Sequence, residues 1–165
     1  MRCLSSCLIF LSVLTSCVDL EKYDYRHIVK LESQLLEQQV LEYDSAYAEQ
    51  LLQAYRIFLS SHPTSSKKTE LLFKYAEVLK GQGSWLDAAE IFHQVHDLHP
   101  ESSLAPLALF HQAHCFEMLQ QKLTAKNTYQ EFITRYPNHP YIEQAKGMIA
   151  LLQYSDEELM QQFQE

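Results

Sequence analysis

The sequence predicts an all-α fold built from helical repeats, and three observations indicate it. Three dipeptides recur with a period of 37 residues: His62-Pro63, His99-Pro100 and Tyr136-Pro137. Each closes a stretch whose apolar residues follow helical spacing. Small residues keep the same register away from the prolines: Ala76, Ala113 and Ala150. A fixed period of this length means that each unit must stack on its neighbours to bury its apolar face. A generic helical bundle is the alternative, but it does not explain the constant spacing.

Residues 1–16 have the pattern of a secretory signal peptide. Arg2 precedes the apolar run 8–14, which is far shorter than the roughly 20 residues needed to span a bilayer. The next segment, Leu14-Thr15-Ser16-Cys17, resembles the bacterial lipobox. In proteins with that motif the leader is cut before the cysteine, which is then acylated. The resemblance implies that Cys17 is lipidated and that residues 17–26 form a tether. An ordinary signal peptide with an incidental cysteine is the alternative.

Residues 27–63 are predicted to form a degenerate first repeat. A helix is expected over residues 21–43, because Ile28, Leu31 and Leu35 share one helical face, and Asp44-Ser45 would break it. A coiled-coil stalk is the alternative. Its seam would continue at Gln38 and Glu42, however, so the apolar pattern ends after about one heptad, short of the three or four required.

Residues 64–100 and 101–137 are predicted to form repeats two and three, each an antiparallel helix pair. The i, i+3, i+4, i+7 pattern occurs twice in repeat two, in Leu72, Tyr75, Ala76 and Leu79 and again in Ala88, Ile91, Phe92 and Val95. The glycines of the intervening segment 80–83 would supply left-handed positions that stop the first helix. The closing proline cannot continue a helix, so it turns the chain toward the next unit. Pro106 and Pro140 stand where first-turn prolines are favourable.

These two repeats resemble the tetratricopeptide repeat. The matching positions are Ala76, Ala88, Phe92 and Pro100 in repeat two, and Ala113, Ala125, Tyr129 and Pro137 in repeat three. Repeat one matches less well, because Leu51 stands where a small residue is usual. The resemblance implies a superhelix of about three helix pairs whose concave face receives partner segments. When the groove positions of the tetratricopeptide repeat are mapped onto this sequence by the repeat register, the residues that line the groove are Phe73, Glu77, Lys80, Phe110, His114, Glu117 and Met118. The alternative is that Phe73 and Phe110 fill the join between repeats.

Residues 138–165 are predicted to cap the array. A helix is expected over residues 141–153, and Ser155-Asp156-Glu157-Glu158 has the pattern of a capping box that opens a last short helix. Several polar residues would give these helices the polar outer face that an array end needs: Gln161, Gln162, Gln164 and Glu165.

The charge of the chain limits the kinds of partner that it is expected to bind. The chain has 13 basic and 21 acidic residues, and loss of Arg2 with the leader would leave a net charge of about minus nine. A nucleic-acid partner is not expected, because the densest basic spot is the pair Lys67-Lys68.

Cys3 and Cys7 would leave with the leader and Cys17 would be acylated. The remaining Cys115 is expected to be a small core residue rather than part of a disulfide.

The sequence shows no catalytic motif, so no enzyme activity, cofactor or small-molecule substrate is expected. Histidine is the one candidate for metal chemistry. His93, His96 and His99 are spaced by three residues, and His111 and His114 lie on the next predicted helix. His93, His96 and His111 are therefore weak candidates for a divalent metal site. Surface histidines are the alternative, because a site needs ligands that converge.

The resemblances together favour a non-catalytic adaptor that binds envelope proteins or peptides and reaches the membrane through its lipid. The segment 136–145 is similar to the repeat junctions of the lipoprotein subunit of the outer-membrane β-barrel assembly machinery and of the Tol-Pal-associated periplasmic repeat protein. Val18, rather than aspartate, follows Cys17. In bacterial lipoproteins, whose lipobox this segment resembles, the lack of aspartate at this position generally directs the protein to the outer membrane, so the resemblance implies the periplasmic face of that membrane. The acidic residues Asp19, Glu21 and Asp24 leave the cell surface as the alternative. A structural homo-oligomer is the second functional class, and a His-rich metal-binding protein the third.

Overall fold

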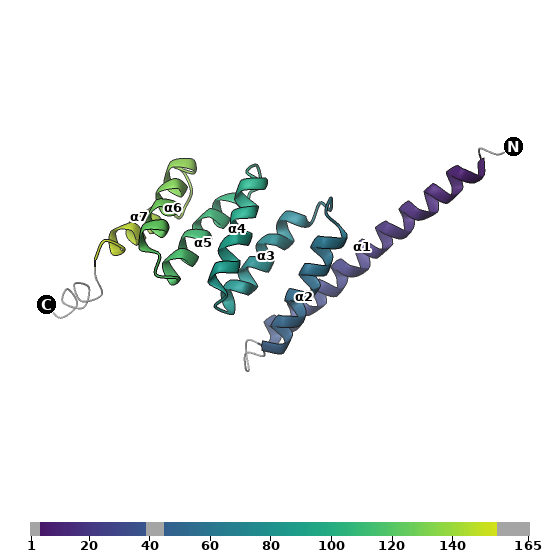
Figure 1. The fold of residues 1–165 in the computed structure, drawn as a ribbon, viewed down its shortest axis with the longest axis horizontal. Coiled ribbons are helices and arrows are strands. Elements are labelled where there is room, and N and C mark those ends of the chain that lie inside the picture. The colour runs from purple at the N-terminus through teal and green to yellow at the C-terminus, as the bar shows by residue number, and fades with distance from the viewer. Residues whose placement is uncertain (1–3, 39–44, 155–165) are drawn as a thin grey trace. The chain divides into compact units, whose positions relative to one another are not determined.

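A computed structural model describes residues 4–38 and 45–154 of the chain (Figure 1). It divides into two compact units, residues 1–68 and residues 69–165. The described part of the first unit contains α1 (Leu4–Gln38) and α2 (Ser45–Ser61). That of the second contains α3 (Lys68–Gly81), α4 (Trp85–Leu98), α5 (Ala105–Met118), α6 (Lys122–Arg135) and α7 (Ile142–Leu151). The described residues contain no strand, so the predicted all-α fold is confirmed.

The helix boundaries repeat with the period of the prolines. Helices α3, α5 and α7 begin 37 residues apart, and α2, α4 and α6 end 37 residues apart, each two residues before a closing proline. The proline lacks an N–H group and its ring collides with a preceding helical turn, so the same stop recurs in each unit. Pro106 lies in the first turn of α5, as predicted, whereas Pro140 precedes α7, which begins at Ile142.

In the second unit, the turn between the two helices of each of the pairs α3–α4 and α5–α6 contains one left-handed residue. Gly83 has a φ of 77° between α3 and α4, as predicted, whereas Gly81 ends α3 without one. The equivalent residue between α5 and α6 is Gln120, with a φ of 59°. A side chain at this backbone conformation is strained, so repeat three carries a local cost that repeat two avoids.

Small and aromatic residues form the core of the second unit. The predicted packing alanines are fully buried in both pairs: Ala76, Ala88, Ala113 and Ala125. Ala150, which has the same register as Ala76 and Ala113, is exposed on α7, and the buried alanine of that helix is Ala145. Ala145 packs with Phe110, Tyr129 and Phe132 in a cluster that joins α5, α6 and α7.

The first unit is an antiparallel pair. Ile28, Leu31 and Leu35 of α1 are buried, as are Tyr55 and Phe58 of α2. The Tyr55 hydroxyl donates a hydrogen bond of 2.7 Å to Glu32 Oε1 across the pair. The segment after α2 is fastened to α1 by a 2.9 Å contact between His62 Nε2 and Asp24 Oδ2, and by a 2.6 Å hydrogen bond from Ser65 to Glu21.

Helix α1 begins earlier than the expected first helix of repeat one, and it runs through Cys17 and the predicted tether. Within the described residues, no helix combines the length and the apolar content that a membrane span requires. The predicted helix over residues 141–153 corresponds to α7, whereas residues 39–44 and the predicted last helix lie outside the described residues.

Candidate functional site

Helices α3 and α5 bring together a polar and aromatic cluster at the predicted groove. We call it the α3–α5 cluster: Phe73, Glu77, Lys80 and His111. The half-buried Phe73 ring lies edge-on to the buried Phe92 ring at a centroid distance of 5.5 Å, and 6.0 Å from the His111 ring. The sequence placed Phe73, Glu77 and Lys80 in one groove, and the contacts with His111 link them to the next repeat.

The cluster is held by charged hydrogen bonds. Lys80 Nζ lies 2.7 Å from Glu77 Oε1 and 3.3 Å from His111 Nδ1. An ammonium only donates, so His111 Nδ1 accepts and the ring proton is assigned to Nε2, which lies 3.8 Å from the same Glu77 oxygen. Burial, followed by the positive charge of Lys80, lowers the pKa of His111 to about 4. At neutral pH this imidazole is therefore uncharged.

The groove residues of repeat three lie at the other end of α5. The Tyr129 hydroxyl donates a 3.0 Å hydrogen bond to Glu117 Oε2, and His114 Nδ1 lies 3.6 Å from the same oxygen. The Trp85 ring meets the His114 ring edge-on at 6.2 Å. Met118 is 44% exposed. Met118 follows Glu117 and lies one helical turn after His114, and an exposed thioether there suits contact with a partner side chain.

The contact between the end of the first helix and the aromatic residue of the second helix differs between the two repeats. By the 37-residue register, Lys80 and Phe92 are the equivalents of Glu117 and Tyr129. Lys80 Nζ lies 6.0 Å from the centroid of the Phe92 ring, which is a cation–π distance. A cation over a ring in repeat two thus replaces the tyrosine–carboxylate hydrogen bond of repeat three.

Phe110 corrects one expectation, since the structure places its ring in the core rather than in the groove. The residue is only 5% exposed, and its ring lies 5.4 Å from both Tyr129 and Phe132 and 5.2 Å from Tyr141. Phe73 and Phe110 each contact His111, at 6.0 and 5.9 Å. The alternative interpretation, that the ring fills the join between repeats, therefore holds for Phe110.

His96 corrects a second expectation, because it is 3% exposed rather than on the surface. Its Nε2 lies 2.8 Å from Gln112 Oε1 and 3.3 Å from His93 Nδ1. The amide oxygen only accepts, so Nε2 carries the proton, and Nδ1 is buried with no hydrogen-bond partner in the described structure. Burial is the main cause that lowers the pKa of His96. Ala89, Phe92 and His96 share one buried stripe, a signal that the sequence contained.

The three metal candidates do not converge. His93 and His96 contact each other, whereas His111 is bonded to Lys80 in the α3–α5 cluster. Among the described residues, no group of three or more histidine, cysteine, aspartate or glutamate side chains could hold a metal ion. Cys115 is buried and free, as predicted for a core residue.

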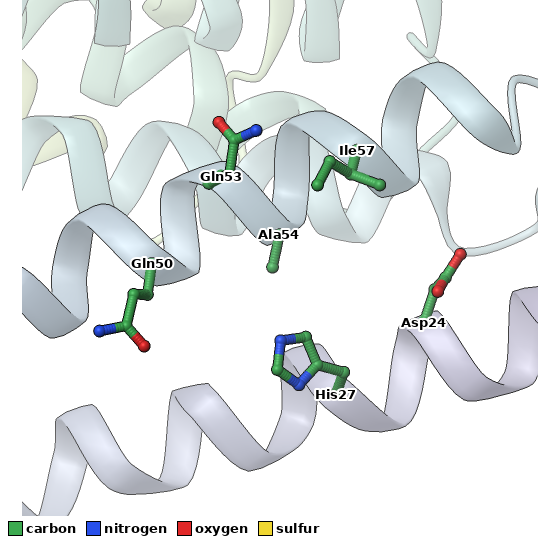
Figure 2. A pocket seen from close by; sticks show the side chains of 6 residues that line it. All are labelled: Asp24, His27, Gln50, Gln53, Ala54 and Ile57. Carbon is green, nitrogen blue, oxygen red and sulfur yellow. The ribbon is translucent and has the colours of Figure 1, made fainter.

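The first unit contains a pocket that the sequence did not indicate. It lies between α1 and α2 and has a volume of about 280 Å³. Figure 2 shows His27 pointing from α1 toward Ala54 on α2. The lining residues are Asp24, His27, Gln50, Gln53, Ala54 and Ile57.

Comparison with known proteins identifies the repeats of the second unit. Residues 70–102 and 107–139 match the family model of the tetratricopeptide repeat. The two matched segments begin 37 residues apart and cover most of α3–α4 and α5–α6, respectively. No curated protein matches the chain.

Proposed function

We propose that this chain, whose α3–α4 and α5–α6 pairs are tetratricopeptide repeats, is a non-catalytic scaffold that docks a partner protein or peptide on α3 and α5. Tetratricopeptide repeats suggest protein–protein interaction. The observation that carries the proposal is the partly exposed α3–α5 cluster, which continues along α5 to His114, Glu117 and Met118.

The chemistry of this surface favours an extended segment with both polar and apolar side chains. Lys80 and Glu77 are 20% and 38% exposed, so both retain hydrogen-bonding capacity toward a ligand. Because His111 is uncharged at neutral pH, Glu77 and Lys80 balance each other and the cluster has no net charge. Phe73 and Met118 supply apolar contact at either end. Such a surface selects by hydrogen bonding and shape rather than by long-range attraction.

We also propose that the scaffold is anchored to the outer membrane of a Gram-negative envelope through a lipid on Cys17 and serves in outer-membrane protein assembly. The leader pattern and the lipobox resemblance support this placement. Multiple acyl chains hold a protein on a membrane far more firmly than a single chain does. The Cys17→Ser variant should move from the membrane fraction to the soluble fraction. Equal fractionation of the variant and the wild type would remove the anchor from the proposal.

Docking is tested by affinity capture from detergent-solubilised membranes with two matched double variants. Lys80→Met with Met118→Ala alters the proposed surface, and Lys126→Met with Leu123→Ala makes the same kinds of change at exposed positions on α6. Recovery of the captured partner should fall at least about tenfold for the first pair, a loss of about 1.4 kcal/mol, and stay unchanged for the second. Equal recovery with both pairs, at equal thermal stability, would refute docking on this face.

A further inference from the structure

The repeat register indicates which side of α2 corresponds to a stacking surface. In α6, Thr128, Glu131 and Arg135 lie on one stripe at helical spacing, and Thr128 is buried. This stripe faces α4, because the charges of Glu131 and Arg135 act on the buried His96 of that helix. The equivalent stripe of α2 begins with Ala54 and Ile57, which line the α1–α2 pocket. The pocket therefore lies on the side of the helix that is turned toward the preceding helix pair in repeat three.

On the first unit this side is open and partly apolar. We call it the α1–α2 face: Leu20, Tyr23 and His27 on α1, with Gln50, Ala54 and Ile57 on α2. Leu20, Tyr23 and His27 share one stripe at helical spacing. Leu20 is 55%, Tyr23 70% and Ile57 48% exposed. Large apolar side chains exposed on the side of the unit that contains a pocket indicate that another surface covers this side.

We propose that the α1–α2 face binds the same face of a second copy of this chain, in a two-fold symmetric dimer. A two-fold interface requires a patch that complements itself. The amides of Gln50 and Gln53 both donate and accept hydrogen bonds, so each can pair with its own counterpart. The Asp24 carboxylate is satisfied within its own copy by His62. Tyr23, which is 70% exposed on the same stripe as His27, provides an aromatic ring that enters the pocket of the other copy.

Charge also favours a second copy as the occupant. Residues 20–38 and 45–68 contain six basic and five acidic side chains, so two such surfaces meet without strong repulsion. Residues 69–154 contain six basic and nine acidic side chains, which disfavour pairing of the second unit with itself. A face of two helices about 25 Å long and about 20 Å wide is small for a stable dimer, so the association is weak. It is independent of partner docking on α3 and α5.

The dimer is tested by site-specific photo-crosslinking of the full chain, co-expressed with two different epitope tags. A benzophenone amino acid at Gln53 should yield a product of twice the chain mass that contains both tags. The same residue at Val29, which is exposed on the other side of α1, serves as the position control and should yield at least about tenfold less. Ala54→Arg should reduce the Gln53 product by at least about tenfold, whereas Ser33→Arg, on the opposite side of α1, should not.

The crosslinked peptides decide between modes of association. Linkage of position 53 to residues of α1 or α2 in the other copy supports the two-fold dimer. Linkage to α7 would show head-to-tail stacking, and a product that contains a different protein would show a heterologous partner. Either result, an absence of product, or equal yields at positions 53 and 29 would overturn the proposal. The melting temperature of the Ala54→Arg chain should equal that of the wild type. This equality shows that the loss of crosslinked product does not come from unfolding.

Discussion

Replacing Phe110 with alanine removes the ring that joins α5 to α6 and to the chain just before α7. The ring is almost completely buried and makes edge or tilted contacts with Tyr129, Phe132 and Tyr141 at centroid distances of 5.2 to 5.4 Å. Phe-to-Ala changes in packed cores cost about 3–5 kcal/mol, which includes the cavity left behind. Because three rings lose a neighbour at once and cannot all move inward, we expect a loss of about 4 kcal/mol.

Phe73→Ala is the matched control, because Phe73 and Phe110 are equivalent positions of repeats two and three. Each contacts the equivalent aromatic ring of its own repeat, Phe92 for Phe73 and Tyr129 for Phe110. Phe73 is half-buried, so its truncation should cost only about 1–2 kcal/mol. The assay is urea unfolding followed by circular dichroism at 222 nm, with the midpoint and the slope fitted separately. A loss for Phe110→Ala that is smaller than the loss for Phe73→Ala would refute the assignment of Phe110 to the core.

Three further predictions follow from single residues. The folded-state pKa of His111, about 4, lies below that of an exposed histidine, about 6.5, so the unfolded state binds more protons between these values. The free energy of unfolding should therefore fall as the pH drops from about 6.5 to 4, and thermal melts of His111→Gln should show a smaller drop. Gln120→Gly should raise the stability by about 0.5–1 kcal/mol in urea unfolding, because it relieves the positive φ; no gain would contradict this strain. Burial raises the pKa of Cys115 to about 11, so at pH 8 about one thiol in a thousand is ionised, and its alkylation, followed by mass spectrometry, should be far slower than in urea. Equal rates would contradict its burial.

The helical repeats could be predicted from the sequence because a single 37-residue period determines both where the helices end and which residues occupy equivalent positions in successive repeats. The closing prolines place the ends of α2, α4 and α6, and the small alanines mark where the helices of a pair approach closely. Phase alone could not separate Phe73 from Phe110, since both contact the aromatic residue of their own second helix. Their burial differs because Phe132 and Tyr141 stand where repeat two has the smaller Val95 and Leu104.

The polar part of the site was harder to predict. His96 lies on one helical stripe with the buried Ala89 and Phe92. Its burial was not predicted, because histidine is polar and because the apolar pattern placed the buried face at Ile91 instead. The bond between Lys80 and His111 joins two repeats, and no pattern within one repeat contains it. The α1–α2 pocket is lined by residues of two helices, so the sequence of either helix alone does not reveal it.

Photo-crosslinking in the native membrane tests most directly the claim that the α5 end of the groove docks a partner. The crosslinking amino acid is placed at Met118, on the proposed surface, or at Leu123, which is more exposed but lies on α6. A discrete adduct with another protein is expected from position 118 and none from position 123. An adduct from position 123 alone, or none from either position, would contradict docking on this face.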